Sequence, residues 1–363
     1  MSLPQPLLLY VNPAWRKTGM LHIPLLYPFW GNALNKERTP FQWQLFERHG
    51  FDTAYYSITD DIAAADAILM PYSHNHASKF APDILALCVH SSKESGKPLV
   101  IDGIGDIEHS VTIPNTLVIR YGGYRFEKKE NEIHIPPYAD DLLEIYCAST
   151  LKMREKNKTP TISFAGWASL TNGQEMRARI KELPDRLRSL FVSHFAAKKK
   201  GVFFRREAVE VLKKSKEVAP HFLVRRSYSG HSDTAERSQQ ELRGEFVQNL
   251  LGSDYALDVR GDANASIRLF EILSLGRIPV IVDTERNLPF ADTVDYASFA
   301  LIVDFRDLKK LPRILADFHA KLSPEQFVAM QIAARDAYRN HFRIDALTAH
   351  LVGEIQKRLA LVA

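Results

Sequence analysis

Cysteine is scarce in this sequence, and long apolar runs are missing from it. The chain of 363 residues has only two cysteines, Cys88 and Cys147, and no Cys-x-x-Cys motif, which excludes a disulfide framework. No apolar run approaches the roughly 18–20 residues that a membrane-spanning helix needs. The N-terminal residues also lack a basic segment followed by a long apolar stretch. We therefore expect a cytoplasmic protein with reduced thiols.

Net charge is small but unevenly distributed. The chain carries +4 overall, whereas residues 151–226 hold 19 Lys and Arg against 7 Asp and Glu, which leaves −8 for the rest. Such a basic stretch is either a solvated helix face or a contact with an anionic partner. Peripheral attachment to the inner face of an anionic membrane fits it. No nucleic-acid-binding motif accompanies the charge, so nucleic acid is not an expected partner.

Strand-like and helical segments alternate along the chain, which predicts α/β layers. The 45% hydrophobic content and the length favour two domains. Strands are expected at Leu7–Val11, Ala67–Met70, Leu99–Ile101, Leu117–Arg120, Thr161–Ala165, Val202–Phe204, Phe222–Val224, Tyr255–Val259, Ile278–Val282 and Leu301–Val303. Helices are expected at Phe41–His49, Pro82–Ser95, Gln174–Lys181, Glu207–Val218, Ala235–Leu251, Ser266–Leu275, Pro324–His341 and Ile344–Leu361. A charged, proline-flanked stretch at 152–160 resembles a linker, so we place the domains at 1–155 and 156–363.

One helix places an arginine where a cation is unfavourable. In residues 261–282, "GDANASIRLFEILSLGRIPVIV", Ser266 suits an N-cap and Gly276 suits the residue after the last turn. Arg268 then falls in the first turn, beside the positive end of the helix dipole. Arg268 and Glu271 form a narrow polar stripe on an otherwise apolar helix.

An anion at the start of this helix would remove the penalty. Arg268 and the backbone donors around Asn264 and Ser266 are suited to a phosphate, and Glu271 could accept hydrogen bonds from a sugar diol. A nucleoside diphosphate joined to a sugar meets both demands. The alternative is an Arg268–Glu271 ion pair that fills a solvated groove.

The segment "SIRLFEILSLGRIPVIVDTERNLPF" resembles the C-terminal signature of exostosin-like glycosyltransferases. "AADAILMPYS" (64–73), "NEIHIPPY" (131–138), "TISFAG" (161–166) and "FALIVDFRDLKKLPRIL" (299–315) resemble further segments of that family in the same order. Two features depart from the family pattern. Arg277 stands where the family often has cysteine, and "YALDVRG" lacks the usual proline.

The resemblance implies a GT-B architecture, in which two Rossmann-like domains face a cleft. The first domain would bind the acceptor and the second the nucleotide-sugar donor, and the C-terminal helix could pack back on the first domain. The implied activity is an inverting transfer of a sugar from a nucleoside-diphosphate donor to a hydroxyl of a glycan, polysaccharide or glycolipid. Uridine as the base follows from the resemblance alone. The alternative is an inactive regulatory protein that binds a nucleotide sugar or a glycan.

An inverting transferase needs one general base in its acceptor domain. Asp102 and Asp106, in "VIDGIGD", follow a predicted strand and lie beside glycines that allow a sugar to approach. His74 is the next candidate for the base, and His76 is a candidate acceptor contact. Each of these can instead have an ordinary structural role.

The donor side offers further candidates. Arg225 and Arg226 could reach a diphosphate, and Gly166 corresponds to the glycine that opens the second domain in the family. Trp167 could stack on an acceptor sugar or simply pack between the domains. No Asp-x-Asp motif occurs in the chain, so we expect a nucleotide sugar as co-substrate and no requirement for metal.

Overall fold

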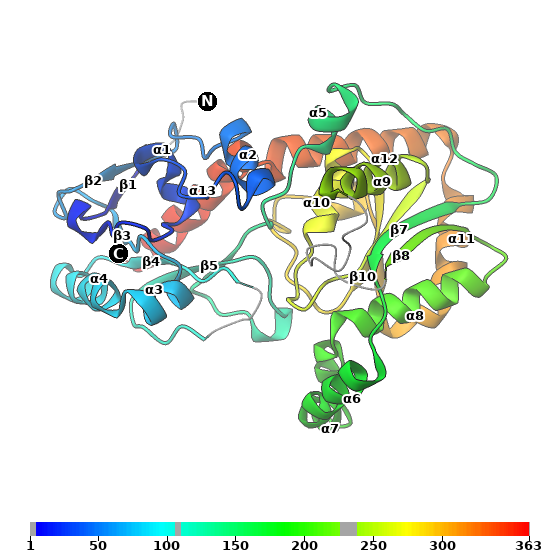
Figure 1. Cartoon of the computed structure of the whole chain (residues 1–363), viewed down its shortest axis with the longest axis horizontal. Coiled ribbons are helices and arrows are strands. Elements are labelled where there is room, and N and C mark those ends of the chain that lie inside the picture. Colours follow the sequence, from blue (N-terminus) through cyan, green and yellow to red (C-terminus); the bar gives the residue numbers. More distant parts are fainter. Residues whose placement is uncertain (1–4, 106–109, 226–237, 363) are drawn as a thin grey trace.

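The computed structural model describes residues 5–105, 110–225 and 238–362. These residues form two domains, each built on a parallel sheet with helices packed against it (Figure 1). The expected α/β class is therefore confirmed.

Six parallel strands of the described residues form the first sheet, in the order β2-β1-β3-β4-β5-β6. They are β1 (Leu7–Tyr10), β2 (Tyr56–Thr59), β3 (Ala67–Leu69), β4 (Leu99–Asp102), β5 (Thr116–Arg120) and β6 (Glu132–His134). Every residue of β3, β4 and β5 is buried. Continuous burial of this kind is typical of parallel strands covered on both faces.

The second sheet has the order β11-β10-β9-β7-β8, again with all strands parallel. Its strands are β7 (Thr161–Trp167), β8 (Ala219–Arg225), β9 (Tyr255–Asp258), β10 (Ile278–Asp283) and β11 (Leu301–Asp304). In both sheets the chain order reverses beside the first strand, between β1 and β3 and between β7 and β9. Ligands of doubly wound folds bind at such switch points, at the carboxyl ends of the strands.

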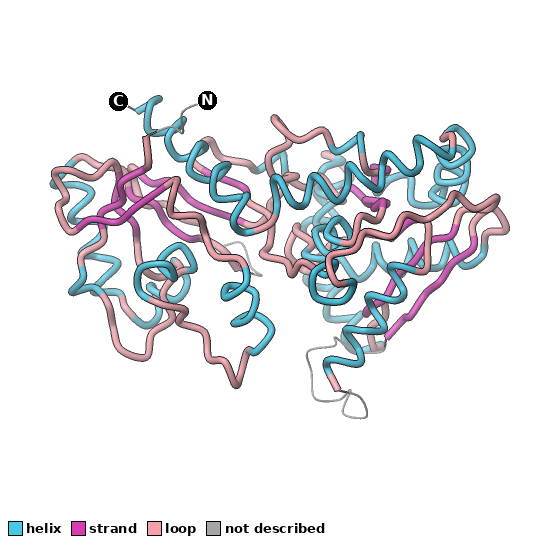
Figure 2. Tube along the Cα trace, turned by 90° about the horizontal axis from the view of Figure 1, so that it is seen from above, coloured by secondary structure: helices cyan, strands magenta, loops and turns pink. Residues whose placement is uncertain are grey.

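Helices connect these strands and cover the sheets, as the tube in Figure 2 also shows. In the first half they are α1 (Tyr27–Trp30), α2 (Pro40–Arg48), α3 (His74–Phe80), α4 (Pro82–Ser95) and α5 (Leu142–Cys147). In the second they are α6 (Asn172–Lys181), α7 (Leu183–Ser189), α8 (Gly201–Lys214), α9 (Gln239–Leu251), α10 (Ile267–Ser274), α11 (Leu311–Lys321), α12 (Pro324–Ala337) and α13 (Ile344–Val362). Capping boxes start three of them, with Thr171, Ser238 and Ser323 as N-caps.

The C-terminal helix crosses back to the first domain. Ile344, Leu347, Leu351 and Ile355 of α13 lie in the same apolar core as the strands of the first sheet, and Figure 1 shows the red helix beside the blue strands. The C-terminal part of the segment predicted as the second domain (156–363) thus packs with the first domain. This is the arrangement that the family resemblance allowed.

Several observed elements differ from the sequence-based expectation. Val202–Phe204, predicted as a strand, lies in the first turn of α8, because its three large apolar side chains face the core on a helix as well as they would on a strand. The short strands β2 and β6 and the helices α1, α3, α5, α7 and α11 were not predicted.

Among the described residues, no helix is both long and apolar enough to cross a membrane.

Candidate active site

Arg268 lies at the switch point of the second sheet. It stands in the first turn of α10, and its Nη2 donates a hydrogen bond to the Ala165 carbonyl of β7 at 2.8 Å. Its guanidinium carbon lies 4.7 Å from the centroid of the Phe164 ring. The predicted cation at this helix start is therefore held against the carboxyl end of β7.

Gly166 makes room for this arginine. A Cβ atom built on Gly166 would lie 2.6 Å from Arg268 Nη2, and the glycine has a φ of +153° that other residues rarely adopt. The glycine identified from the family resemblance is thus the residue that permits the close approach between β7 and the guanidinium.

We predict that Gly166→Ala moves the Arg268 guanidinium without unfolding the domain. The methyl group would collide with Nη2, at the end of a flexible side chain, and an alanine at a φ of +153° is also strained, so the arginine and the local backbone of β7 would both shift. Given the donor-binding role that the family resemblance implies for Arg268, turnover should fall by about tenfold or more, since small displacements of such a group are costly. Steady-state kinetics with a nucleotide-sugar donor measure this. Gly96→Ala is a matched control, because Gly96 also has a positive φ, of +71°, and an added Cβ there meets nothing within 4 Å. Equal rates for the two variants would contradict the prediction.

Ser266 is the N-cap residue of α10, but its side chain does not cap the helix. Its hydroxyl instead donates to Asp258 Oδ1 at 2.5 Å, and the other oxygen of Asp258 forms a buried ion pair with Arg286. The Ser266 side chain thus fixes the loop before α10 to the end of β9. Any contact between Ser266 and a phosphate would therefore be made by its backbone N–H.

Asn264 joins the two domains. Its Nδ2 donates to the Gly123 and Thr284 carbonyls, each at 3.1 Å, and its Oδ1 accepts from Thr284 Oγ1 at 2.8 Å. Gly122 packs so closely on Asn264 that a Cβ would lie 2.6 Å from the Asn264 carbonyl oxygen. The loop after β5 therefore meets the loop before α10, which brings the carboxyl ends of both sheets together.

Glu271 lies one turn into α10 and is buried. Its Oε1 is 2.6 Å from Arg243 Nη1 on α9, and Arg243 Nη2 is 3.4 Å from Asp140 Oδ2. Burial raises the pKa of Asp140, and Arg243 partly offsets this. Arg243 and Asp140 are the site neighbours that sequence reasoning missed. The adjacent acids of "PPYADD" after β6 were the available signal for Asp140.

On the acceptor side, the predicted residues follow neighbouring strands. His74 begins α3 just after β3, at the switch point of the first sheet. His76, in the same turn of α3, packs on Phe80 with ring centroids 4.8 Å apart. Asp102 ends β4, the strand next to β3.

Asp102 is the most perturbed of these candidates. It is only 6% exposed and accepts one backbone hydrogen bond, from the Ile104 N–H at 2.8 Å. Burial raises the pKa of this carboxyl to about 7. A carboxyl with a pKa near neutrality is suited to general acid–base work, although simple burial gives the same shift.

The remaining predicted residues are less informative. Arg225 Nη2 donates to the Leu242 carbonyl at 3.1 Å and lies 3.7 Å from Glu245. The Trp167 ring lies 5.8 Å from Lys200 Nζ. Arg226 and Asp106 lie outside the described residues.

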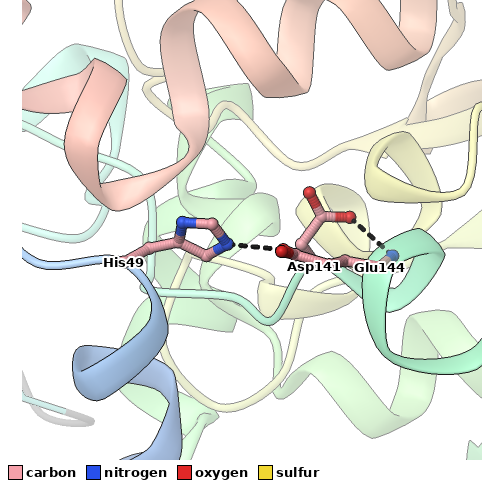
Figure 3. A group of neighbouring side chains, drawn as sticks. All are labelled: His49, Asp141 and Glu144. Atoms are coloured by element: carbon pink, nitrogen blue, oxygen red, sulfur yellow. Dashed lines mark hydrogen bonds and ion pairs between the residues drawn. The ribbon is translucent and has the colours of Figure 1, made fainter. Parts of the chain in front are cut away.

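His49, Asp141 and Glu144 place possible metal-ligand atoms within 4.8 Å of one another (Figure 3). His49 Nε2 is 2.6 Å from Glu144 Oε2. Both oxygens of Asp141 accept hydrogen bonds from Arg335, at 2.6 and 2.9 Å, and Arg343 lies 3.7 Å away. Because two guanidiniums already balance this carboxylate, we interpret the group as an ion-pair network that ties α2, α5 and α12 together.

With the site in view, the comparisons with known proteins decide the family. The family model described as the exostosin GT47 domain matches residues 123–318, more than half of the chain. The chain belongs to the exostosin GT47 family. The GT47 match includes Gly166, Arg268 and Glu271, whereas Asp102 and His74 precede it.

Two curated relatives of this GT47 chain match parts of it. A 129-residue stretch is 30% identical to the Exostosin-1 homolog of Caenorhabditis elegans and covers 35% of this chain and 33% of that protein. A 105-residue stretch is 30% identical to an Arabidopsis thaliana protein named "Probable glycosyltransferase" and covers 29% of this chain and 19% of that one. The matched stretches thus span a third or less of these relatives.

Solved structures with a similar course of the chain include a glycosyltransferase from Rickettsia africae. It has 11% identity and a TM-score of 0.40, and the match covers 98% of each chain. Anabaena HepE, solved in complex with UDP, has 11% identity and a TM-score of 0.37 over 98% of this chain and 100% of that one. At TM-scores this low, the strand order of the two sheets remains the basis for describing the fold.

Proposed function

We propose that this GT47 chain is an inverting glycosyltransferase that moves a hexosyl or pentosyl group from a UDP-sugar to a hydroxyl of a polysaccharide, glycan or glycolipid. The observation that supports this most is Arg268, held at the start of α10 and against the end of β7 at a switch point. Family membership supports the transfer chemistry. UDP is proposed on the family resemblance.

The proposed reaction is a single in-line displacement. The acceptor hydroxyl attacks the anomeric carbon and loses its proton to a base, while the bond from that carbon to the diphosphate breaks. Negative charge then grows on the departing nucleoside diphosphate. Arg268 and the N–H groups at the start of α10 would stabilise this charge, because preorganised donors act where charge develops.

We propose Asp102 as the base on the strength of its pKa and its place at the end of β4. His74, at the neighbouring switch point, is the second candidate, and Asp106 stays a prediction. In the donor domain, Glu271 would accept hydrogen bonds from the two ribose hydroxyls. Its ion pair with Arg243 would have to open when they bind.

The reaction is proposed to need no metal, because Arg268 supplies the positive charge that a cation would otherwise bring. Activity should therefore persist in the presence of EDTA. Loss of turnover on chelation, restored by added Mg²⁺ or Mn²⁺, would contradict this part of the proposal.

A thermal-shift panel of UDP-, GDP-, CMP- and TDP-sugars tests the donor class. A ligand at 100 times its Kd stabilises the folded state by about 2.7 kcal/mol, so one nucleotide class should raise the melting temperature by several degrees. UDP-sugars are expected to do so, and Arg268→Ala should abolish the shift. If no nucleotide sugar stabilises the protein, the proposed function is wrong. If a nucleotide sugar binds but is never turned over, the chain is a regulatory binding protein.

A further inference from the structure

The segment that follows β7 projects from the second domain as two consecutive helices, α6 and α7 (Figure 1). Neither helix contains a buried residue. The Arg186 N–H donates to the Glu182 carbonyl and the Glu182 N–H donates to the Ala178 carbonyl, so helical hydrogen bonding continues across their junction. We call residues 172–192 the arm. Helices of this length are marginal in water unless their apolar face is covered by a partner. In α6 and α7 no residue is buried.

One side of the arm is apolar and open to solvent. Met176, Ile180, Leu183, Leu187 and Leu190 follow one another at positions i, i+4, i+7, i+11 and i+14, and they are 52–76% exposed. This spacing keeps them on one face of a helix over about 20 Å. Phe191, which is 89% exposed, and Val192 continue the same patch at its end. Exposed apolar patches of this kind mark interaction sites.

Basic side chains accompany the apolar stripe. Residues 171–200 contain eight Lys and Arg against three Asp and Glu. The three acids are already engaged: Glu175 pairs with Arg179 and Arg206, Asp185 lies 3.5 Å from Arg188, and Glu182 Oε1 accepts from the Lys200 N–H. Lys198, Lys199 and Lys200 pair with Glu127, Glu207 and Asp262. Among the described residues, the positive excess beside the stripe therefore comes from Arg177, Lys181 and Arg186.

We propose that the arm docks this protein onto an anionic lipid bilayer. An apolar helix face flanked by Lys and Arg is the pattern of helices that lie in the membrane interface, with the apolar side in the acyl boundary and the cations among the headgroups. Anionic lipids complement the net charge of the arm.

Two other partners could cover such a surface, a second copy of the arm or an RNA strand, and both fit it less well. A second copy of the arm would bring a net +2 against a net +2, and like charges across an interface are unfavourable. An RNA strand would complement the charge, but it would leave the aliphatic stripe in water, because nucleic acids are bound through phosphates and stacked bases.

A cavity behind the arm suits lipid headgroups. It has a volume of about 300 Å³ and lies between α7 and α8; its basic lining residues are Arg179, Arg186, Lys199 and Arg206. Phe195 and Phe203 close its apolar side, and Glu182 and Asp185 also reach it. Arg179 and Arg206 pair with Glu175, and Lys199 lies 3.7 Å from Glu207, so a headgroup phosphate would compete with these carboxylates for the cations.

The arm also lies close to the candidate active site in the fold, and the step that follows rests on the proposed function. The arm begins five residues after Trp167, at the same edge of the second sheet as Gly166 and Arg268. A bilayer held by the arm would lie near the end of the sheet that binds the donor. A lipid-linked saccharide is therefore the acceptor class that this geometry favours.

Vesicle flotation with the whole chain, in the absence of any substrate, tests the docking. Vesicles of phosphatidylcholine with phosphatidylglycerol should bind the protein, and vesicles of phosphatidylcholine alone should bind it at least about tenfold more weakly. Leu187→Glu with Phe191→Glu should lower the partition coefficient about tenfold or more, because two apolar side chains no longer enter the interface. Arg177→Ser with Lys181→Ser should lower it by a similar factor and reduce its dependence on salt.

Ile332→Glu on α12 is the matched control, since this side chain is 43% exposed and lies outside the arm; vesicle binding should be unchanged. Circular dichroism should show unaltered folding for all variants, because every changed side chain is on the surface. Equal binding to both vesicle types would overturn the proposal. A dimer that forms in sedimentation experiments and that Leu187→Glu dissociates would also overturn it. So would RNA binding that persists in Leu187→Glu while the native protein binds no vesicles. The thermal shift with UDP-sugars is read separately, so failure of docking and failure of the proposed function are distinguishable.

Discussion

Arg268→Ala is expected to lower kcat by about 10²–10³-fold, the usual loss when a preorganised charge-stabilising donor is removed. The guanidinium reaches the Ala165 carbonyl and the face of Phe164, so its position is set before any ligand arrives. Steady-state kinetics with the donor identified by thermal shift measure the effect. Because the interaction is proposed to strengthen as the diphosphate departs, the loss should appear in kcat as well as in kcat/KM.

Two further variants sharpen this result. Arg268→Lys keeps the charge but loses the planar fork that binds two phosphate oxygens, so its rate should fall between those of the native protein and Arg268→Ala. Arg313→Ala on α11 removes an arginine that is 80% exposed and pairs with Asp317, and its rate should match the native one. Turnover of Arg268→Ala within about threefold of native, at unchanged folding, would rule out the phosphate role.

Asp102→Asn is expected to lower kcat by about 10²–10⁴-fold, the range that a general base contributes. The amide keeps the hydrogen bond from the Ile104 N–H but cannot take a proton. In the native protein the base must be ionised, and burial raises the pKa of Asp102 to about 7. The native rate should therefore fall about tenfold per pH unit below pH 7, and this limb should vanish in the variant.

The same substitution, which should lower the rate, should raise the free energy of unfolding at alkaline pH. The folded pKa of Asp102 lies above its unfolded value, so the folded state binds the proton more tightly. Stability from this group is complete below about pH 4 and is lost as the pH rises through about 7. Asp102→Asn should thus raise the free energy of unfolding at pH 8, by an amount on the order of 4 kcal/mol at most. Urea titrations at pH 4 and pH 8 measure the difference.

These two readouts separate a base from a merely buried acid. Stabilisation at pH 8 with unchanged turnover would show that Asp102 is structural and would pass the role of base to His74 or Asp106. Asp304→Asn is the control at the end of β11, where the carboxylate is 42% exposed and pairs with Arg306; it should leave the pH profile of the rate unchanged.

Local patterns predicted most of the fold. The strands are continuous apolar runs, because parallel strands covered on both faces need no polar alternation, and periodicity placed α4, α10 and α12 near their observed bounds. Val202–Phe204 was wrongly predicted as a strand, because three consecutive apolar residues fit a buried helix turn or a buried strand equally well. β2 (Tyr-Ser-Ile-Thr) and β6 (Glu-Ile-His) were missed because polar residues interrupt them, so neither has the continuous apolar run that marked the other strands.

The site divides in a similar way. Arg268 was predictable because a cation at the positive end of a helix violates a local preference and therefore calls for a reason. Gly166 was identified from the family resemblance alone. The side-chain partners of Asn264 and Ser266 were not predictable. Asn264 bonds to Gly123 and Thr284, and Ser266 bonds to Asp258, and nothing in the flanking residues distinguishes these bonds from capping.

By itself, the sequence determined the two α/β halves and the arginine at the start of α10, which follow from side-chain periodicity and from charge along one segment. The family follows from the resemblance of several motifs and from the GT47 match. The tertiary structure decided what each polar group touches: Glu271 against Arg243, Asn264 across the domain boundary, α13 on the first sheet, and the arm with its apolar face in water. Contacts between segments far apart in the chain depend on how the sheets and helices pack, and local sequence holds little information about that packing.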